Sequence, residues 1–443
     1  MTHSPRAAID RRAVLRLGGL TLASLAASPA LAACAGAALN STDSGGAGDA
    51  AAPVKIGYVS PQTGALAPFG EADAFVVAAI EEWVRAQGGV QVGGSRHGVE
   101  IVVKDSQSDA KRAGDVAGEL ILQDGVHVVL VSSTPETTNP VADQCEANGV
   151  PCISTVAPWQ PYFLGRGATP DTPFTWTYHF FWGLEDVEAV YLDMWNQVGS
   201  NRTIAALWPN DSDGNAWGDA TNGFPPVVAA QGYTIVDPGH YANGTQDFSG
   251  QIAAFRAAGA ELLVGVPIPP DFTTFWTQAA QQGFRPKLAT IGKALLFPSS
   301  IEALGDIGEN LGTEVWWTPS HPFTSSLTGQ TAKALADAYT TETGKPWTQP
   351  IGFVHALFEV AFAALGQAGS PDDRAGIAAA LTTLDIDTVV GPLDWTAGPV
   401  PNVAKTPLVG GQWRAAGQGY DLVVVSNSQH PNIPTGGSVQ ALA

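Results

Sequence analysis

Residue types that carry out catalysis are present in this chain, but their spacing matches no catalytic or metal-binding motif. The eight histidines are scattered, with no His-x-His or His-Glu-x-x-His pattern, so a metal centre is not indicated. The nucleophile-elbow sequence Gly-x-Ser-x-Gly is absent. Adjacent carboxylates at Glu185 and Asp186 stand where a helix is expected to begin, which favours helix capping over acid–base chemistry. We therefore predict that the protein is not an enzyme.

Glycine-rich nucleotide-binding sequences are also missing. Gly292-Lys293 lies in the segment Ile291–Ala294 without the upstream glycine of a phosphate-binding loop. No Gly-x-Gly-x-x-Gly follows the strand-like residues Ile56–Val59, so a dinucleotide site is not indicated. The chain has 41 acidic and 21 basic residues, and its formal charge of −20 disfavours nucleic acid as a partner. We predict no cofactor and no metal ion.

The segment Val54–Glu82 is the clearest candidate for ligand binding. Val54–Ser60 is rich in strand-forming residues, Pro61–Gly70 is a turn with two prolines and two glycines, and a helical pattern begins at Glu71. Such a unit places its loop at the carboxyl end of a strand and the amino end of a helix. In open α/β sheets, ligands bind there because free helix N–H groups face the crevice. We expect this loop to form one wall of a small-molecule site.

Strand-like and helix-like segments alternate through most of the chain, which is typical of α/β proteins with parallel sheets. A first set runs from Val54 to Thr155, a break rich in proline and aromatic residues covers Pro158–Trp182, and a second set runs from Glu185 to Ile291. Three further helical segments follow Trp317 without a strand pattern between them, so they are expected to cover the sheet of an earlier domain. The prediction is an α/β fold with two Rossmann-like halves.

The first 33 residues are predicted to be an export signal and not part of the fold. The sequence DRRAVLR at residues 10–16 resembles the twin-arginine export motif, and an apolar stretch follows at Leu17–Ala27. The sequence LAAC ending at Cys34 resembles the lipobox at which bacterial lipoproteins are cleaved and lipidated. Residues 34–52 have the composition of a flexible tether, and no later stretch reaches the ~18 consecutive apolar residues of a membrane-spanning helix. We expect an extracytoplasmic body held at the membrane by lipid alone.

Two cysteines remain if Cys34 carries a lipid. Cys145 and Cys152 lie in the sequence CEANGVPC, at an expected helix end and strand start, close enough along the chain to bridge. In an oxidising compartment such a pair can form a disulfide, and two buried free thiols are the alternative.

Taken in order, these segments resemble the periplasmic binding proteins of ABC importers, of the leucine-binding, branched-chain amino acid and amide type. The resemblance extends from Lys55 to about Trp413. It is carried by KIGYVSPQTGALAPFG at the start, by residues 105–154 in the first half, by WPNDSDGNAWGDA and GTQDFSGQIAAFRAAGAELLVGV in the second half, and by VVGPLDW near the end.

The resemblance implies two Rossmann-like lobes with parallel-type sheets, joined by three crossover hinge segments, with a solute held in the cleft between them. The implied bounds are residues 53–178 and 319–390 for lobe one, and residues 179–318 and 391–443 for lobe two. The implied crossovers lie near Tyr178–Trp182, Trp316–Pro319 and Val390–Trp395. Closure of the lobes around a solute is a hinge motion, and the closed form is what a transporter recognises. The implied partners of this monomer are a small-molecule solute and the permease and ATPase subunits of an importer.

The resemblance also implies which residues line the cleft. Phe69 matches a position where relatives place an aromatic ring against the ligand, and the alternative is a ring packed within its own loop. Ser133 and Thr134 stand where relatives hold a ligand carboxylate, although hydroxyl residues at a helix start are also common as N-caps. The expected ligand-binding residues are Phe69, Ser133, Thr134, Glu136, Thr155, Ala157, Trp159, Trp182, Trp217, Ile268 and Lys293.

Lys293 departs from the pattern of the amino-acid binders. These proteins tend to carry an acidic residue near this position to pair with the ligand ammonium, which a lysine cannot do. If Lys293 faces the cleft, the solute offers an anionic or acceptor group there, and the alternative is an exposed surface lysine. The 13 tryptophans favour a flat or bulky apolar body. We predict a carboxylate-bearing solute that is apolar or aromatic, with a branched-chain or other amino acid or amide as the alternative.

A sensor that feeds a signalling receptor is a second alternative, because the same two-lobed module serves both purposes. The sequence from Met1 to Ala443 contains no output domain, which favours transport. Genes for a permease and an ATPase beside this one would separate the two.

Overall fold

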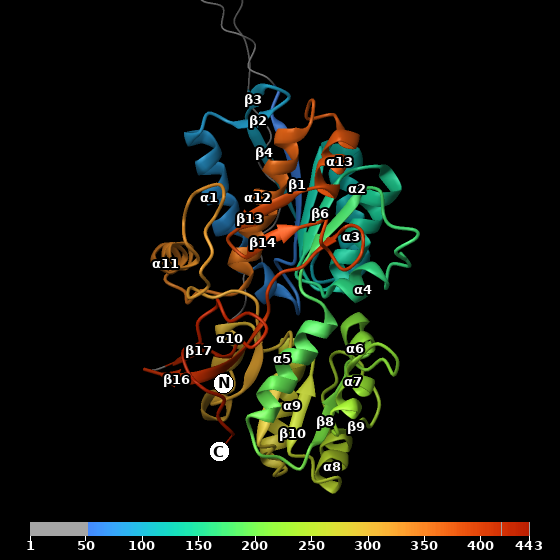
Figure 1. The fold of residues 1–443 in the computed structure, drawn as a ribbon, viewed down its shortest axis with the longest axis vertical. Helices are drawn as coiled ribbons and strands as arrows, with labels where there is room; N and C mark the ends of the chain where they lie inside the picture. Colours follow the sequence, from blue (N-terminus) through green and yellow to red (C-terminus); the bar gives the residue numbers. More distant parts are fainter. Residues whose placement is uncertain (1–51, 418, 443) are drawn as a thin grey trace, which may run out of the picture. The chain divides into compact units, whose positions relative to one another are not determined.

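The computed structural model describes residues 52–417 and 419–442. The expected export signal, the lipidated Cys34 and nearly all of the tether lie outside the described residues. The described part forms two α/β lobes, each built around one large β-sheet (Figure 1).

The sheet of lobe one is parallel throughout. Its strands are β1 (Val54–Ser60), β4 (Val99–Asp105), β5 (Val128–Ser132), β6 (Cys152–Thr155), β7 (Thr177–Phe180) and β15 (Val403–Ala404). They are hydrogen-bonded in the order β15-β7-β6-β5-β1-β4. Side chains alternate between the two faces, so Ile56 and Tyr58 belong to one hydrophobic cluster and Val59 to another. Both faces are therefore covered, as expected for a parallel sheet.

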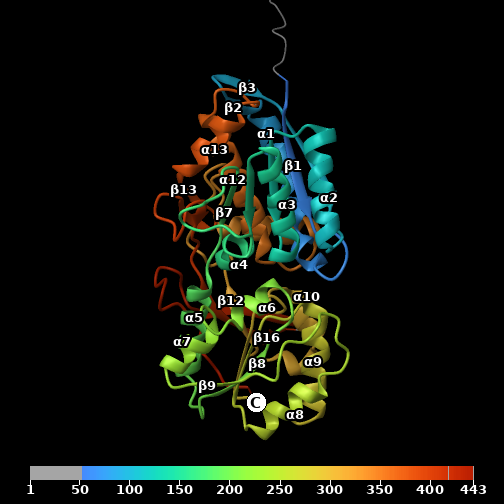
Figure 2. The same cartoon turned by 90° about the vertical axis from the view of Figure 1, so that its right-hand side faces the viewer.

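Helices from distant parts of the sequence cover these two faces (Figure 2). They are α1 (Asp73–Ala86), α2 (Ala110–Glu119), α3 (Pro135–Asn148), α4 (Trp159–Phe163), α11 (Ala332–Thr343), α12 (Pro350–Gln367) and α13 (Arg374–Thr382). A π-helical turn (Leu120–Asp124), a 3-10 turn (Ala67–Gly70) and two hairpins, β2–β3 (Val90–Val92, Ser95–His97) and β13–β14 (Asp385–Thr388, Gly391–Asp394), complete the lobe. Helix α12 is long and apolar enough to cross a membrane, but 83% of it is buried, and it is the core helix of this lobe.

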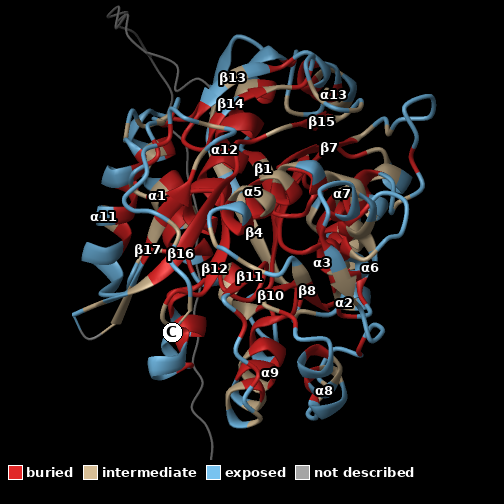
Figure 3. Ribbon diagram, turned by 60° about the horizontal axis from the view of Figure 1, so that its bottom comes forward, coloured by how far each residue is buried: buried red, intermediate tan, exposed pale blue. Residues whose placement is uncertain are grey.

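The sheet of lobe two is mixed. Its strands are β8 (Thr203–Leu207), β9 (Thr234–Val236), β10 (Leu262–Gly265), β11 (Leu288–Ile291), β12 (Gly312–Val315), β16 (Val409–Ala416) and β17 (Gly419–Ser426). The first five pair in parallel, and the hairpin β16–β17 adds to β12 in antiparallel fashion. Its helices are α5 (Leu184–Asn196), α6 (Ser212–Trp217), α7 (Phe224–Ala230), α8 (Ser249–Ala257), α9 (Pro269–Gln281) and α10 (Pro298–Glu302), with a 3-10 turn at Gly305–Gly308. The central strands β8, β10, β11 and β12 are buried beneath these helices (Figure 3), whereas the edge strand β9 and one end of the β16–β17 hairpin are partly exposed.

The chain passes between the two sheets three times. The first passage lies between β7 and α5, at residues 181–183, and the second begins after β12 at Trp316. The third lies at residues 405–408 and not at Val390–Trp395, because β14 pairs with β13 and β15 pairs in parallel with β7. Residues 391–404 therefore extend lobe one, and β7 carries lobe one to Phe180, which corrects the bounds given by the resemblance. A two-residue strand has no sequence pattern, so the sequence did not reveal this return to the first sheet.

Cys145 near the end of α3 and Cys152 at the start of β6 are both fully buried free thiols. Of the two predicted alternatives, a disulfide or two buried free thiols, the structure has the two free thiols. Burial raises the pKa of the Cys145 thiol well above its usual range, which keeps this side chain protonated and unreactive.

Candidate functional site

A small cavity lies between the lobes. Residues from lobe one and the first crossover that line it are Phe69, Thr134, Val156, Pro158, Phe181 and Trp182. Residues from lobe two and the second crossover that line it are Asp213, Trp217, Val266, Lys293, Leu296, Glu314 and Trp316. The cavity has a volume of about 20 Å³, which is room for about one water molecule. The two lobes are therefore closed upon the cavity.

Direct contacts between the lobes hold this closed arrangement. The Phe69 ring meets the Phe297 ring at the start of α10, with centroids 4.8 Å apart and planes at 77°. Glu136 in the first turn of α3 accepts a hydrogen bond from the backbone N–H of Ser212 in α6, at 2.7 Å. Near the first crossover, Trp159 Nε1 donates to Glu185 Oε1 at 3.1 Å.

Several buried polar atoms of the cavity have no partner in the protein. They are the Thr134 hydroxyl, the indole nitrogens of Trp182, Trp217 and Trp316, and one carboxylate oxygen of Asp213. Thr134 occupies the N-cap position of α3, yet its hydroxyl makes no capping bond. Buried polar groups are nearly always hydrogen-bonded, because leaving one unpaired costs about 1–3 kcal/mol. A concentration of unpaired donors in one cavity therefore indicates a place where a polar ligand binds.

The Trp217 donor is held rigidly by the aromatic core of lobe two. The Trp217 ring stacks on Phe224 with centroids 5.1 Å apart, and Tyr191 and Trp208 pack against it at 6.0 and 6.1 Å. A Cβ atom at Gly292 would lie 2.7 Å from Trp217 Cη2, so only glycine allows this ring to approach the loop after β11. The direction of the Trp217 N–H is thus fixed before any ligand arrives.

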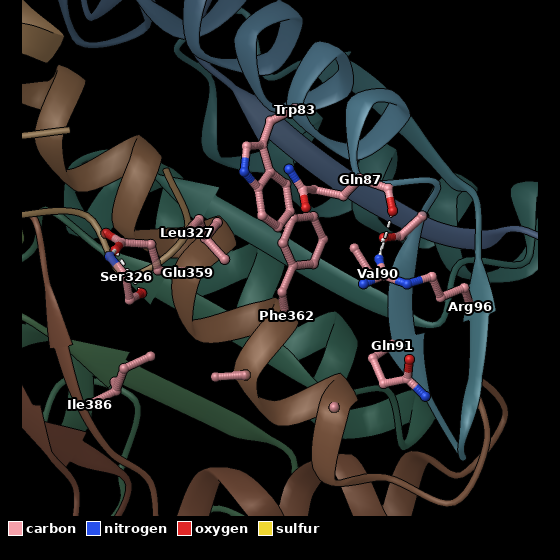
Figure 4. Close-up of a pocket in the computed structure, with 13 residues that line it drawn as sticks. Trp83, Gln87, Val90, Gln91, Arg96, Ser326, Leu327, Glu359, Phe362 and Ile386 are labelled. Carbon is pink, nitrogen blue, oxygen red and sulfur yellow. Dashed lines mark hydrogen bonds between the residues drawn. The ribbon is translucent and has the colours of Figure 1, made fainter. Parts of the chain in front are cut away.

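A larger pocket in lobe one is less well suited to recognition (Figure 4). It occupies about 360 Å³ between α1, α12 and the β2–β3 hairpin, beside the stacked rings of Trp83 and Phe362. Its polar groups are already used within the protein: Glu359 accepts from Ser326 and Val389, and Arg96 Nη1 donates to two backbone carbonyls. No buried polar side-chain atom of its lining residues, all of them among those described, lacks a partner. The cavity between the lobes is therefore the candidate site.

Lys293 lines the cavity, but its charge is neutralised within the protein. Its ammonium lies 3.0 Å from Asp211 Oδ2 and 2.8 Å from Asp213 Oδ2, and the side chain is 4% exposed. Burial alone would lower the pKa of Lys293, but Asp211 and Asp213 reverse this and hold the pKa well above its usual value. The alternative of an exposed surface lysine is therefore wrong. Because both aspartates share the ammonium, Lys293 does not offer an uncompensated positive charge to a solute.

Two acidic residues of the cavity, Asp213 and Glu314, were missed by the sequence reasoning. Glu314 Oε1 accepts from the backbone N–H of Lys293 at 3.0 Å, and Glu314 Oε2 accepts from the Tyr191 hydroxyl at 2.7 Å. Burial raises the pKa of each carboxyl group to about 7, and Lys293 opposes this only in part at Asp213. Two signals in the sequence could have found them: an acidic residue within the strand-like sequence TEVWW at residues 313–317, and an aspartate shortly after the strand-forming residues 203–208.

The backbone is strained on both sides of the cavity. Val156, just after β6, has φ 70°, and Lys293, just after β11, has φ 58°. A left-handed backbone is costly for a residue with a side chain, and most costly for a β-branched residue such as valine. Such strain collects at functional sites, where the surrounding structure enforces it. Both strained residues follow parallel strands, at the sheet edge where ligands bind in open α/β folds.

Five of the eleven predicted ligand-binding residues line the cavity: Phe69, Thr134, Trp182, Trp217 and Lys293. The turn at Val156 points that side chain inward, whereas the hydroxyl of Thr155 donates to the Phe180 carbonyl at 2.6 Å and Ala157 packs in the core of lobe one. Trp159 donates its indole N–H to Glu185 near the first crossover and does not line the cavity. Ile268 is the N-cap residue of α9, and Val266, two residues earlier, lines the cavity instead of Ile268.

The two remaining predicted residues lie beside the cavity. Ser133 is buried next to Thr134 with an unpaired hydroxyl, and Glu136 makes the contact between the lobes. Eight lining residues are not among the eleven predicted ones, and Val156 and Pro158 among them lie between predicted residues. They are Val156, Pro158, Phe181, Asp213, Val266, Leu296, Glu314 and Trp316.

Residues 53–418 match the sequence profile of the family described as "Periplasmic binding protein". The chain belongs to the periplasmic binding protein family. Both the family and the two-lobed α/β fold predicted from the sequence are thereby confirmed. This periplasmic binding protein is an extracytoplasmic solute-binding protein of the kind that serves ABC-type transporters.

Individual relatives agree with this assignment. The "Leu/Ile/Val-binding protein homolog 3" of Brucella melitensis is 25% identical over 364 residues, which cover 80% of this chain and 89% of the relative. A leucine-binding protein of Thermotoga maritima has a solved structure with a TM-score of 0.68 and 19% identity, covering 85% of this chain and 99% of that one. A solute-binding protein of Rhodopseudomonas palustris, solved with 3,4-dihydroxybenzoic acid, gives a TM-score of 0.66 and 18% identity, covering 84% and 96%. At such identities the two structures show the fold alone.

Proposed function

We propose that this periplasmic binding protein captures a small carboxylate-bearing solute with an apolar or aromatic body and delivers it to the permease of an ABC importer. The observation that supports this most directly is the set of unpaired donors in the cavity. The Thr134 hydroxyl and the N–H groups of Trp182, Trp217 and Trp316 all need acceptors. A carboxylate is an acceptor-only group that can satisfy several of them at once.

The walls of the cavity favour an apolar or aromatic body on that solute. Phe69, Phe181, Leu296 and Val266 supply apolar surface beside the indole rings. Aromatic side chains bury large areas with little loss of conformational freedom, so a flat or bulky apolar group gains most from such walls. The cavity must open to admit any such solute, because ligand sites typically enclose about 300–1,000 Å³.

A free amino acid with a large apolar side chain is the second candidate, and the acidic residues favour it. One oxygen of Asp213 is unpaired, and Lys293 is already neutralised by Asp211 and Asp213. A solute that brings an ammonium group would therefore meet a partner, whereas a simple acid would face a site without free positive charge. The amino-acid candidate agrees with the name of the Brucella relative, and the simple-acid candidate agrees with the Rhodopseudomonas complex.

A thermal-shift screen followed by calorimetric titration tests the proposal. The panel contains phenylalanine, leucine, 3-phenylpropionate and phenethylamine, which separate the carboxylate, the ammonium and the apolar body. We expect stabilisation by phenylalanine or 3-phenylpropionate and none by phenethylamine, which lacks the carboxylate. Stabilisation by leucine with no response to either aromatic acid would contradict the apolar or aromatic preference.

A variant pair connects that result to the cavity. Thr134→Val removes the unpaired hydroxyl and should weaken binding roughly tenfold, the effect of one hydrogen bond to a charged group. Thr340→Val on the exposed side of α11 is the matched control and should leave binding unchanged. Equal affinity of both variants would show that the solute binds elsewhere.

The attachment and delivery steps are also proposals. We infer that Cys34 carries the lipid that anchors this monomeric protein and that the tether of residues 34–52 lets the body reach its permease. Mass spectrometry of the protein extracted from membranes should find a diacylglyceryl-modified amino-terminal cysteine. Uptake of the identified solute should depend on this protein, and an intact uptake rate in its absence would contradict delivery.

A further inference from the structure

Closing the lobes assembles an unusual set of charges beside the cavity. Glu136 comes from lobe one, and Asp211, Asp213 and Glu314 come from lobe two. The single ammonium of Lys293 lies within 3.0 Å of Asp211 and Asp213, and its backbone N–H binds Glu314. With all four carboxyl groups ionised, this cluster would carry three uncompensated negative charges at a site largely shielded from water.

The contact between the lobes joins the two parts of the cluster. Glu136 accepts a hydrogen bond from the Ser212 N–H at 2.7 Å. Because Asp213 follows Ser212 in the first turn of α6, the Glu136 carboxylate is held beside Asp213. The other titratable groups near the cluster are Tyr191, which donates to Glu314, and Tyr241 and Asp271, which interact with Asp211 and Lys293. None of these adds a positive charge. Bringing the lobes together therefore places like charges close to each other in a poorly solvated site, which is costly.

We propose that closing the lobes takes up protons at Asp213 and Glu314, where the carboxylate of Glu136 is brought in from lobe one, so that the closed form is favoured as the pH falls. This inference goes beyond the proposed function and does not depend on which solute binds. Such coupling would make capture and release of the solute respond to the acidity of the compartment.

The direction of the effect follows from burial. In the closed form, burial raises the pKa of Asp213 to about 7, with Glu136 and Asp211 contributing, and burial raises the pKa of Glu314 to about 7. Opening exposes the cavity to water and returns these groups towards the usual carboxyl range near 4. Between these values the closed form binds more protons than the open form. Each coupled proton changes the closed-to-open ratio up to tenfold per pH unit, and the ratio falls as the pH rises towards 7.

Small-angle X-ray scattering of the protein without any solute tests the inference. The radius of gyration is measured between pH 5.5 and pH 8.5 at constant ionic strength. We expect the smaller value at pH 5.5 and an increase that levels off above about pH 7, the pKa of the buried carboxyl groups. Glu136→Gln keeps an oxygen that accepts the Ser212 N–H but removes the charge, and it should reduce the pH dependence, as should Asp213→Asn. Glu342→Gln, an exposed carboxylate of α11, is the matched control and should behave as the native protein.

Two results would overturn the inference. One is a radius of gyration that stays constant over this pH range in the native protein. The other is a pH dependence that persists unchanged in Glu136→Gln. Circular dichroism checks the folding of each variant, and Glu136→Gln decides the matter alone if Asp213→Asn does not fold, because Glu136 is only partly buried. A failed solute screen leaves this test intact, because no solute is used.

Discussion

The edge of one ring meets the face of another where Phe69 contacts Phe297, with centroids 4.8 Å apart. Phe69 belongs to the loop after β1 in lobe one, and Phe297 is the N-cap residue of α10 in lobe two. The pair therefore forms only when the lobes are closed. The two alternatives for Phe69 in the sequence, a ligand contact or a packed ring, are not exclusive, because the ring packs on Phe297 and also lines the cavity.

The Phe69–Phe297 pair should couple solute binding to closure. Phe69→Ala and Phe297→Ala are each expected to weaken solute binding about threefold to tenfold, because an aromatic pair contributes about 0.5–1.5 kcal/mol beyond buried area. The double variant should lose less than the sum of the single losses, because both changes remove the same contact. Isothermal titration of all four proteins measures this, and strictly additive losses would show that the two rings act independently.

Two tryptophans that the sequence placed in the same cleft should behave differently. Trp217→Phe removes an unpaired N–H from the cavity and is expected to weaken solute binding roughly tenfold. Trp159→Phe removes an N–H that already binds Glu185 outside the cavity, so solute affinity should stay within about threefold of the native value. Both variants keep an aromatic ring, which limits packing loss. A larger effect for Trp159→Phe would place the solute nearer the crossover.

The buried Lys293 should be essential for stability. Lys293→Met leaves Asp211 and Asp213 without their cation, and breaking a buried ion pair from one side costs about 3–5 kcal/mol. Urea unfolding followed by circular dichroism measures the change in unfolding free energy. Lys287→Met removes a half-exposed lysine paired with Glu261 and should leave stability nearly unchanged. Similar stability of the two variants would mean that Lys293 does not neutralise the aspartates.

The two thiols of lobe one should be unreactive in the native protein. Cys145 and Cys152 are both fully buried, and the raised pKa of Cys145 disfavours its thiolate. Iodoacetamide should leave both unmodified under native conditions and should alkylate both after unfolding in guanidinium without a reductant. Peptide mass mapping identifies the modified residues. A peptide pair linked between these cysteines before reduction would show instead that the disulfide forms in the isolated protein.

Much of the fold could be predicted because local sequence patterns indicate its strands, helices and turns. Alternating strand and helix signals, and the loop between β1 and α1, depend on neighbouring residues along the chain. The return of β15 to lobe one could not be predicted, because two residues carry no periodicity and their partner β7 lies more than 200 residues earlier.

The site was predicted less completely for the same reason. Thr134 and Trp217 follow recognisable segments, but the role of Lys293 depends on Asp211 and Asp213, about 80 residues earlier in the chain. Sequence position alone suggested a cation facing the solute. Only the folded arrangement shows that the cation is already paired.

The order of the strands has a consequence for biosynthesis. Lobe two receives its last two strands from residues 409–426, and lobe one receives its edge strand from residues 403–404, so neither sheet is complete until the ribosome has passed residue 403. Domains usually fold one after another from the amino terminus during synthesis, and this chain cannot follow that order. Folding of both lobes can therefore be finished only after these late strands have been synthesised.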